Sequence, residues 1–107
     1  MRIRPEGEAD RAAVRAVNEA AFDTSLEADL VEVLRDKGLP LISLVAEVDD
    51  EVVGHILFSP VSLTGHPDLD VMGLGPMAVA PQQQRKGIGS ALVSEGLEFC
   101  KRLGCQL

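Results

Sequence analysis

A pair of glycines at the start of an amphipathic helix restricts the fold of this sequence more than any other feature. Gly87 and Gly89 follow a β-rich run that ends at Val79 and a polar loop. After them, apolar residues repeat with helical spacing, namely Ile88, Leu92, Phe99 and Leu103. Glycine lets the backbone approach a ligand closely, and the first amides of a helix have no intrahelical acceptor. These amides lie at the positive end of the helix dipole, so the segment predicts an anion site suited to a pyrophosphate.

Composition limits how such an anion can be held. The chain has 107 residues and a net charge of −7, so a polyanion must be bound by groups gathered at one site. Arg85 and Lys86 add positive charge to such a site. The negative net charge argues against binding to nucleic acid or to an anionic membrane. No signal-like or membrane-spanning apolar run is present, which favours a cytoplasmic protein. Cys100 and Cys105 are expected to be buried thiols, and no metal site is expected.

Two other phosphate-binding motifs fit less well. A P-loop requires two glycines five positions apart followed by Lys and Ser or Thr, and this chain has no such run. The dinucleotide-binding fingerprint matches formally from Gly73 to Ala78, but Pro81 and a polar loop follow it where a helix should open. We therefore interpret Gly73, Gly75 and Pro76 as a bulge in a strand.

The rest of the chain predicts a small α/β domain. Strands are expected at residues 1–4, 41–48, 52–63 and 69–79, the middle two forming an antiparallel hairpin. Two helices are expected between the first and second strands. The second of these helices has a predicted capping box from Thr24 to Glu27. Its expected apolar face consists of Leu26, Leu30, Val33 and Leu34. Neither His55 nor His66 has a partner visible in the sequence, so both are expected to be satisfied or solvated rather than catalytic.

The run Gln84-Arg85-Lys86-Gly87-Ile88-Gly89, placed after a Met-Ala-Val strand and a loop, resembles the signature of the GCN5-related N-acetyltransferase (GNAT) family. The resemblance covers nearly the whole chain. It is closest to a subgroup of predicted acetyltransferases of broad or unassigned substrate, on Gly75 to Val79 with Pro81. It implies a mixed, mostly antiparallel sheet flanked by helices, in the order β-α-α-β-β-β-α with the final strands missing. Residues 1–107 are thus expected to be one C-terminally truncated N-acetyltransferase domain.

By this resemblance, acetyl-CoA is the co-substrate, and Gln84, Arg85, Lys86, Gly87, Ile88, Gly89 and Ser90 wrap its pyrophosphate. Met77, Ala78 and Val79 are expected to pair with the pantetheine arm like an added strand. A backbone amide near Val79 would polarise the thioester carbonyl. The implied reaction is direct attack of a primary amine, from a small molecule or a peptide, on the bound acetyl thioester.

The family pattern is incomplete in this chain. Gly73 stands where histone-type members carry a general-base Glu, and the chain contains no Tyr to protonate the thiolate. No catalytic residue is therefore assigned. A non-catalytic acyl-CoA-binding or interaction module stays open as an alternative. If Leu107 is the terminus, the strand at 69–79 has an open edge, which predicts self-association.

Overall fold

The computed structural model describes residues 1–37, 41–61 and 71–104. Its strands are β1 (Arg2–Pro5), β2 (Ile42–Val48), β3 (Glu51–Val61) and β4 (Val71–Val79), and its α-helices are α1 (Arg11–Phe22), α2 (Leu26–Asp36) and α3 (Ile88–Leu103). Short 3-10 helices, η1 (Glu8–Asp10) and η2 (Pro81–Gln83), lie before α1 and after β4. The predicted order of elements is confirmed. No helix in these three ranges is long and apolar enough to cross a membrane.

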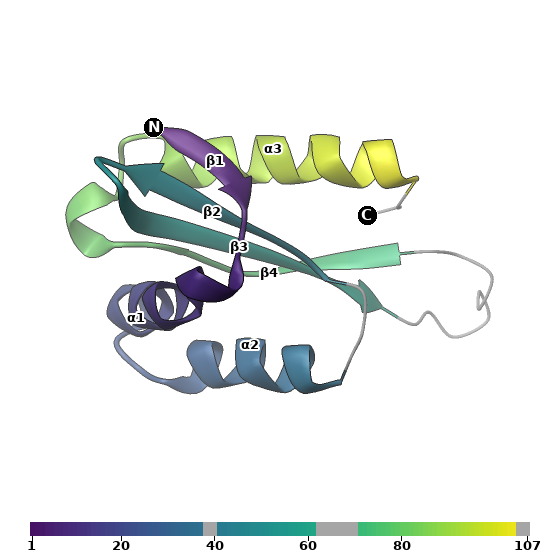
Figure 1. Cartoon of the computed structure of the whole chain (residues 1–107), viewed down its shortest axis with the longest axis horizontal. Coiled ribbons are helices and arrows are strands. Elements are labelled where there is room, and N and C mark those ends of the chain that lie inside the picture. Colours follow the sequence, from purple (N-terminus) through teal and green to yellow (C-terminus); the bar gives the residue numbers. More distant parts are fainter. Residues whose placement is uncertain (38–40, 62–70, 105–107) are drawn as a thin grey trace.

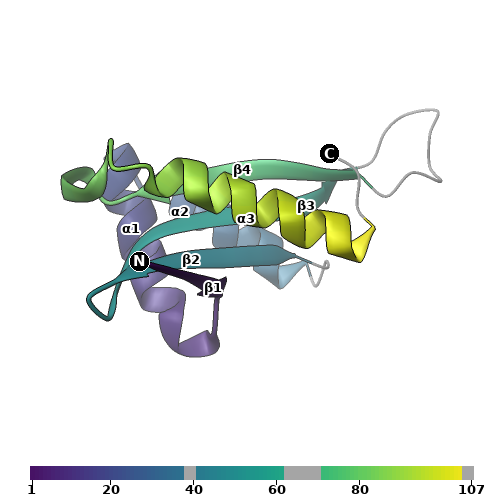
Figure 2. The same ribbon diagram turned by 90° about the horizontal axis from the view of Figure 1, so that it is seen from above.

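The four strands form one antiparallel sheet in the order β1-β2-β3-β4. Helix α3 covers one face of the sheet, and α1 and α2 lie on the other face (Figures 1 and 2). The predicted hairpin is β2 and β3, whose turn residues Asp49 and Asp50 both have positive φ. The expected mixed α/β class, with an antiparallel sheet flanked by helices, is therefore confirmed.

A bulge divides β4 at its glycine-rich segment. Ile56 pairs with Met77 but Phe58 pairs with Leu74, so one residue of β3 faces two of β4. Gly75 is one of those two, and its φ of 137° is a conformation that glycine adopts readily. The predicted bulge is confirmed, and it leaves residues 77–79 as a short segment beyond the irregularity.

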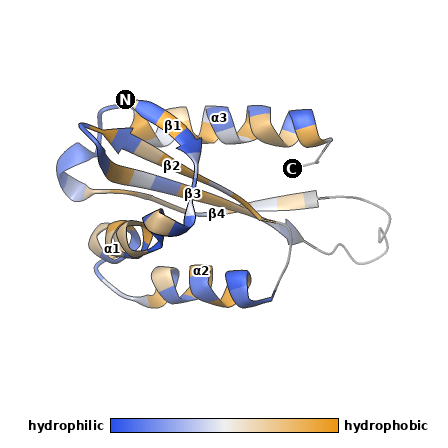
Figure 3. Ribbon diagram, in the orientation of Figure 1, coloured by the Kyte–Doolittle hydropathy of each residue, from blue (hydrophilic) through white to orange (hydrophobic). Residues whose placement is uncertain are grey.

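Helix α3 packs on the sheet through apolar residues of β2, β3 and β4. Figure 3 shows hydrophobic residues along the central strands, beneath a helix that alternates hydrophobic and hydrophilic positions. Ile88, Leu92 and Cys100 are buried, whereas Leu103 is 62% exposed, so the predicted apolar stripe ends before the last turn. Gly104 has a φ of 78° and ends the helix. Cys105 and His66 lie outside the described residues.

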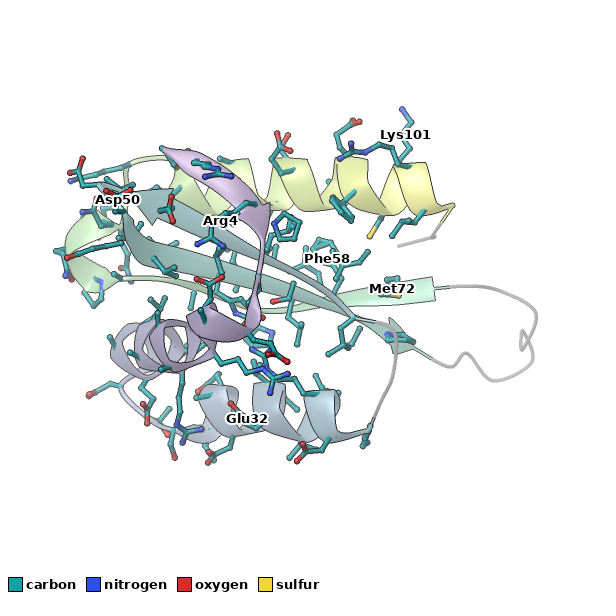
Figure 4. All side chains as sticks on the ribbon, in the orientation of Figure 1. Arg4, Glu32, Asp50, Phe58, Met72 and Lys101 are labelled. Carbon is teal, nitrogen blue, oxygen red and sulfur yellow. The ribbon has the colours of Figure 1, made fainter. Side chains whose placement is uncertain are left out.

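We expect Gly96→Val to destabilise the protein strongly. Gly96 in α3 lies against the buried ring of Phe58, which points from β3 toward α3 in Figure 4. A Cβ at position 96 would lie 2.5 Å from Cζ of Phe58 and 2.7 Å from its Cε1. Such overpacking should lower the free energy of unfolding by about 3 kcal/mol, measured by urea denaturation. The exposed Glu98→Val on the same helix is the control, and equal effects of the two changes would contradict the prediction.

Helices α1 and α2 differ from the prediction in which side chains they bury. Val14 and Val17 of α1 are buried. In α2, however, the buried residues are Ala28 and Val31, and the predicted apolar face is wrong. Leu26, Leu30 and Val33 are 71%, 47% and 50% exposed. Ala28, Val31 and Arg35 share one face of α2, and Arg35 bonds there to Glu6, so the buried face is a mixed one and not the leucine-rich stripe.

The predicted capping box of α2 is also wrong. Ser25 is the N-cap residue, and its side chain makes no capping hydrogen bond. Thr24 instead accepts a hydrogen bond at Oγ1 from the backbone amide of Leu26, at 3.3 Å. Asp23 has a positive φ of 54°, so the chain turns sharply before Thr24 and the helix begins later than expected.

Candidate functional site

The loop from β4 to α3 has the backbone geometry that an anion site requires. Gly87 is the N-cap residue of α3 and has a φ of 83°, a left-handed conformation that glycine adopts without steric cost. The first backbone hydrogen bond of the helix runs from the amide of Ala91 to the carbonyl of Gly87, at 3.0 Å. The amides of Ile88, Gly89 and Ser90 therefore precede the intrahelical ladder and are free for a ligand.

A groove of about 610 Å³ lies along the end of β4, the following loop and the first half of α3. Eight of the ten predicted ligand-binding residues line it: Met77, Val79, Gln84, Arg85, Gly87, Ile88, Gly89 and Ser90. A Cβ on Gly89 would lie 3.4 Å from Cε of Met77 and 3.8 Å from Cγ2 of Val79. The helix start and the strand end thus form two walls of one groove, as the motif predicted.

The other two predicted residues do not line this groove. Ala78 is buried on the opposite face of the sheet, because successive residues of a strand point to opposite sides. Lys86 is exposed, and its Nζ donates a hydrogen bond to Oε1 of Gln83 at 3.3 Å. Ala78 can therefore contact a ligand in the groove only through its backbone. The side chain of Lys86 can reach such a ligand only after a change of rotamer.

Sequence reasoning missed four lining residues. They are Gln83, Val93, Ser94 and Leu97. Val93 and Leu97 lie four and eight residues after Gly89, so they share its face of α3. Helical periodicity counted from Gly89 could have found both. Val93 and Leu97 form an apolar wall of the groove, beyond the end that the first amides of α3 line.

Gln84 holds the loop to the strand. Its side-chain Nε2 donates a hydrogen bond to the carbonyl of Val79 at 3.0 Å. This bond spans the loop that contains η2 and links the two ends of the predicted motif. Gln84 therefore fixes loop geometry through its side chain, in addition to any contact from its backbone.

The electrostatics of the groove differ from those of the whole chain. Among the described residues that line it, Arg85 is the only one with a formal charge, although the chain carries −7 overall. The free amides of α3 add partial positive charge at the same end. The groove therefore favours an anion at its loop end and an apolar or amide-bearing chain along β4.

A second polar cluster lies on the other face of the sheet, under α1 and α2. Asn18 and His55 are both fully buried. Asn18 Nδ2 donates to the carbonyl of Val14 at 3.0 Å and lies 3.2 Å from Nδ1 of His55. Because the amide nitrogen can only donate, Nδ1 of His55 accepts, and the ring proton is assigned to Nε2.

The cluster continues from His55 toward β1 and α2. Nε2 of His55 lies 2.9 Å from Oγ of Ser43, whose hydroxyl donates to Oε1 of Glu6 at 2.6 Å. Arg35 of α2 donates to the second carboxylate oxygen of Glu6. Burial lowers the pKa of His55 to about 4; Glu6 opposes this shift and Arg35 adds to it. His55 is thus neutral and hydrogen-bonded, as the sequence predicted.

The fold and the groove together define a class of protein: an α/β domain with a groove between a bulged strand and a glycine-rich helix start, whose free amides favour an anion. The family model described as "Acetyltransferase (GNAT) family" matches residues 9–107. The chain belongs to this family.

Two curated relatives from Escherichia coli strain K12 agree with this assignment. The uncharacterized N-acetyltransferase YjhQ is 40% identical over 100 residues, which are 91% of this chain and 55% of that protein. The uncharacterized N-acetyltransferase YhbS is 36% identical over 105 residues, 97% of this chain and 62% of that protein. The chain therefore spans between half and two thirds of the length of both relatives.

Solved structures show the same fold. A GNAT family acetyltransferase from Brucella melitensis, in complex with acetyl-CoA, has a TM-score of 0.89 and 40% identity, over 97% of this chain and 70% of that one. Escherichia coli YhbS, in complex with CoA, has a TM-score of 0.91 and 35% identity, over 97% of this chain and 58% of that one.

Proposed function

We propose that this chain is part of an N-acetyltransferase that moves an acetyl group from acetyl-CoA to a primary amine of a small molecule or a peptide. The observation that carries the proposal is the groove between residues 77–79 and the glycine-rich start of α3. Its free amides and its apolar wall match the pyrophosphate and the pantetheine arm of coenzyme A. Two similar proteins that were crystallised with acetyl-CoA or CoA support the choice of ligand.

The ten predicted residues would bind different parts of the coenzyme. The amides at Gly87 to Ser90 would bind the pyrophosphate, with Arg85 and Lys86 supplying charge. The backbone of Met77, Ala78 and Val79 would pair with the pantetheine arm, as a peptide pairs with a sheet edge. Within the described strands, β4 has β3 on one side only, so its other edge is open to such a ligand.

The proposed reaction needs no covalent enzyme intermediate. The neutral amine attacks the thioester carbonyl, a C–N bond forms, and the C–S bond breaks to release the thiolate of coenzyme A. Two effects would accelerate the reaction. The amine and the thioester are held close together, and a backbone amide stabilises the oxyanion that forms. The acetylated amine loses its proton, and the thiolate takes one up. No residue of this chain is assigned to either proton transfer.

A non-catalytic acyl-CoA-binding module is the second candidate. Gly73 stands where histone-type members carry a general-base Glu, which favours binding without turnover. Release of free thiol from acetyl-CoA with a panel of primary amines separates the two candidates. In either case we propose a cytoplasmic protein. Self-association through the open edge of β4, on the condition that Leu107 is the terminus, stays a prediction, to be measured by light scattering.

Acetyl-CoA is expected to raise the melting temperature of the protein, because a ligand that binds only the folded state stabilises it by mass action. At a concentration of one hundred times the dissociation constant, the gain is about 2.7 kcal/mol, which corresponds to a rise of about 10 °C for a domain of this size. Adenine nucleotides without pantetheine should give a smaller rise. Absence of any shift at millimolar acetyl-CoA, with a folded protein by circular dichroism, would refute the proposal.

A further inference from the structure

The buried cluster around His55 lies directly behind the strand segment that faces the groove. His55 pairs with Ala78 in the β3–β4 register, between the pairs Ile56–Met77 and Gly54–Val79. Cross-strand partners point to the same face, so the ring of His55 and the side chain of Ala78 both face α1 and α2. Met77 and Val79 point the other way, into the groove.

This segment is held by few pairings. The bulge separates it from the earlier part of β4, so residues 77–79 pair with β3 only through residues 54–56. The backbone amide of Ala80 adds one more hydrogen bond, to the carbonyl of Val53 at 2.8 Å. The middle residue of the supporting stretch is His55. His55 is therefore the central backbone partner of the segment that lines the groove.

His55 itself is fixed from several elements of the fold. Asn18 of α1 bonds to one ring nitrogen and Ser43 of β2 to the other. Ser43 connects through Glu6, between β1 and η1, to Arg35 of α2. Burying such a network is costly compared with an apolar core of equal volume, so stability alone does not account for it.

We propose that His55 is a positioning residue, whose neutral ring ties the α1–α2 pair to β3 and so holds residues 77–79 in the geometry that binds the acyl-pantetheine arm. This inference rests on the proposed function. It goes beyond that function because it assigns a role to a buried residue that touches no part of the groove. The pyrophosphate end of the groove depends on α3, on the other face of the sheet, and not on this network.

The test compares two ligands on matched variants. His55→Leu removes both hydrogen bonds of the ring, whereas His55→Gln keeps one acceptor and one donor, with a spacing similar to that of the two ring nitrogens. Val45→Ala is the control, because buried Val45 pairs with His55 in the β2–β3 register and takes no part in the network. Each folded variant is titrated with acetyl-CoA and with adenosine 3′-phosphate 5′-diphosphate, which lacks the pantetheine arm.

We expect His55→Leu to weaken acetyl-CoA binding about tenfold or more while nucleotide affinity stays within about twofold. His55→Gln should recover most of the loss, and Val45→Ala should change neither affinity although it lowers stability. Equal losses for both ligands, or no loss for acetyl-CoA, would overturn the inference. If wild-type protein binds neither ligand, the proposed function fails, and the inference fails with it.

Two further measurements apply if His55→Leu does not fold. Ser43→Ala removes the partner of Nε2 and the hydroxyl that donates to Glu6, and it should weaken acetyl-CoA binding selectively, by about threefold. Nitrogen-15 NMR of the wild-type protein at pH 7 should show a neutral His55 protonated at Nε2. Protonation at Nδ1, or an unselective Ser43→Ala variant, would contradict the arrangement on which the inference depends.

Discussion

Valine at position 87 or 89 is expected to weaken acetyl-CoA binding by about a hundredfold or more, which corresponds to about 2.7 kcal/mol. Gly87 has a φ of 83°, which a branched side chain adopts only with strain, so Gly87→Val would distort the start of α3. Gly89 lies against Met77 and Val79 across the groove, so the larger side chain of Gly89→Val would fill ligand space. Isothermal titration calorimetry with acetyl-CoA measures both effects.

Lys86→Ala is the matched control for these substitutions. The Lys86 side chain is exposed and does not line the groove, although it bonds to the lining residue Gln83, so its loss should change the affinity by no more than about threefold. Circular dichroism establishes that each variant is folded before titration. If all three substitutions have equally small effects, the backbone amides do not bind the pyrophosphate, and the proposed arrangement is wrong.

Acid is expected to destabilise the protein through His55. The pKa of His55 is lowered to about 4, chiefly by burial, from an ordinary value of 6.5. The unfolded chain therefore binds a proton between about pH 6.5 and pH 4 that the folded protein does not bind. The stabilisation is complete above pH 6.5 and is lost as the pH falls through this window. The loss approaches about 3 kcal/mol near pH 4.

The experiment measures the free energy of unfolding in urea at several pH values for the wild-type protein and for His55→Gln. The glutamine side chain of this variant cannot titrate, so the difference between the two proteins should change by about 3 kcal/mol between pH 7 and pH 4. The Arg4–Asp10 pair does not interfere, because its hydrogen bonds lower the pKa of Asp10 to about 2. Parallel curves for the two proteins would show that His55 is not buried in its neutral form.

The groove could be predicted from the sequence because its signals are local. Glycine at positions 87 and 89 and the helical spacing of Ile88 and Leu92 describe a helix start within a few residues. The bulge at Gly75 could be predicted for the same reason, since glycine and proline weaken a strand whatever its position in the sheet. Such signals need no knowledge of what packs against them.

Errors arose where burial depends on distant residues. The spacing of Leu26, Leu30 and Val33 predicts an apolar face, yet these side chains are exposed and Ala28 and Val31 are buried instead. Periodicity identifies a stripe but not the element against which a helix packs. For α2 the contacts are made with segments distant in the sequence, such as that of Arg35 with Glu6.

The sequence by itself determined the order of the elements, the bulge in β4 and the glycine-rich helix start, because each depends on the conformational preferences of neighbouring residues. Only the tertiary structure placed Glu6, Asn18 and Ser43 around His55, since their hydrogen bonds join residues 12 to 37 positions apart. Helical spacing places Val93 and Leu97 on the same face of α3 as Gly89, but the tertiary structure sets that face across the groove from β4. Long-range contacts of this kind form when the sheet brings distant segments together, and no local pattern records them.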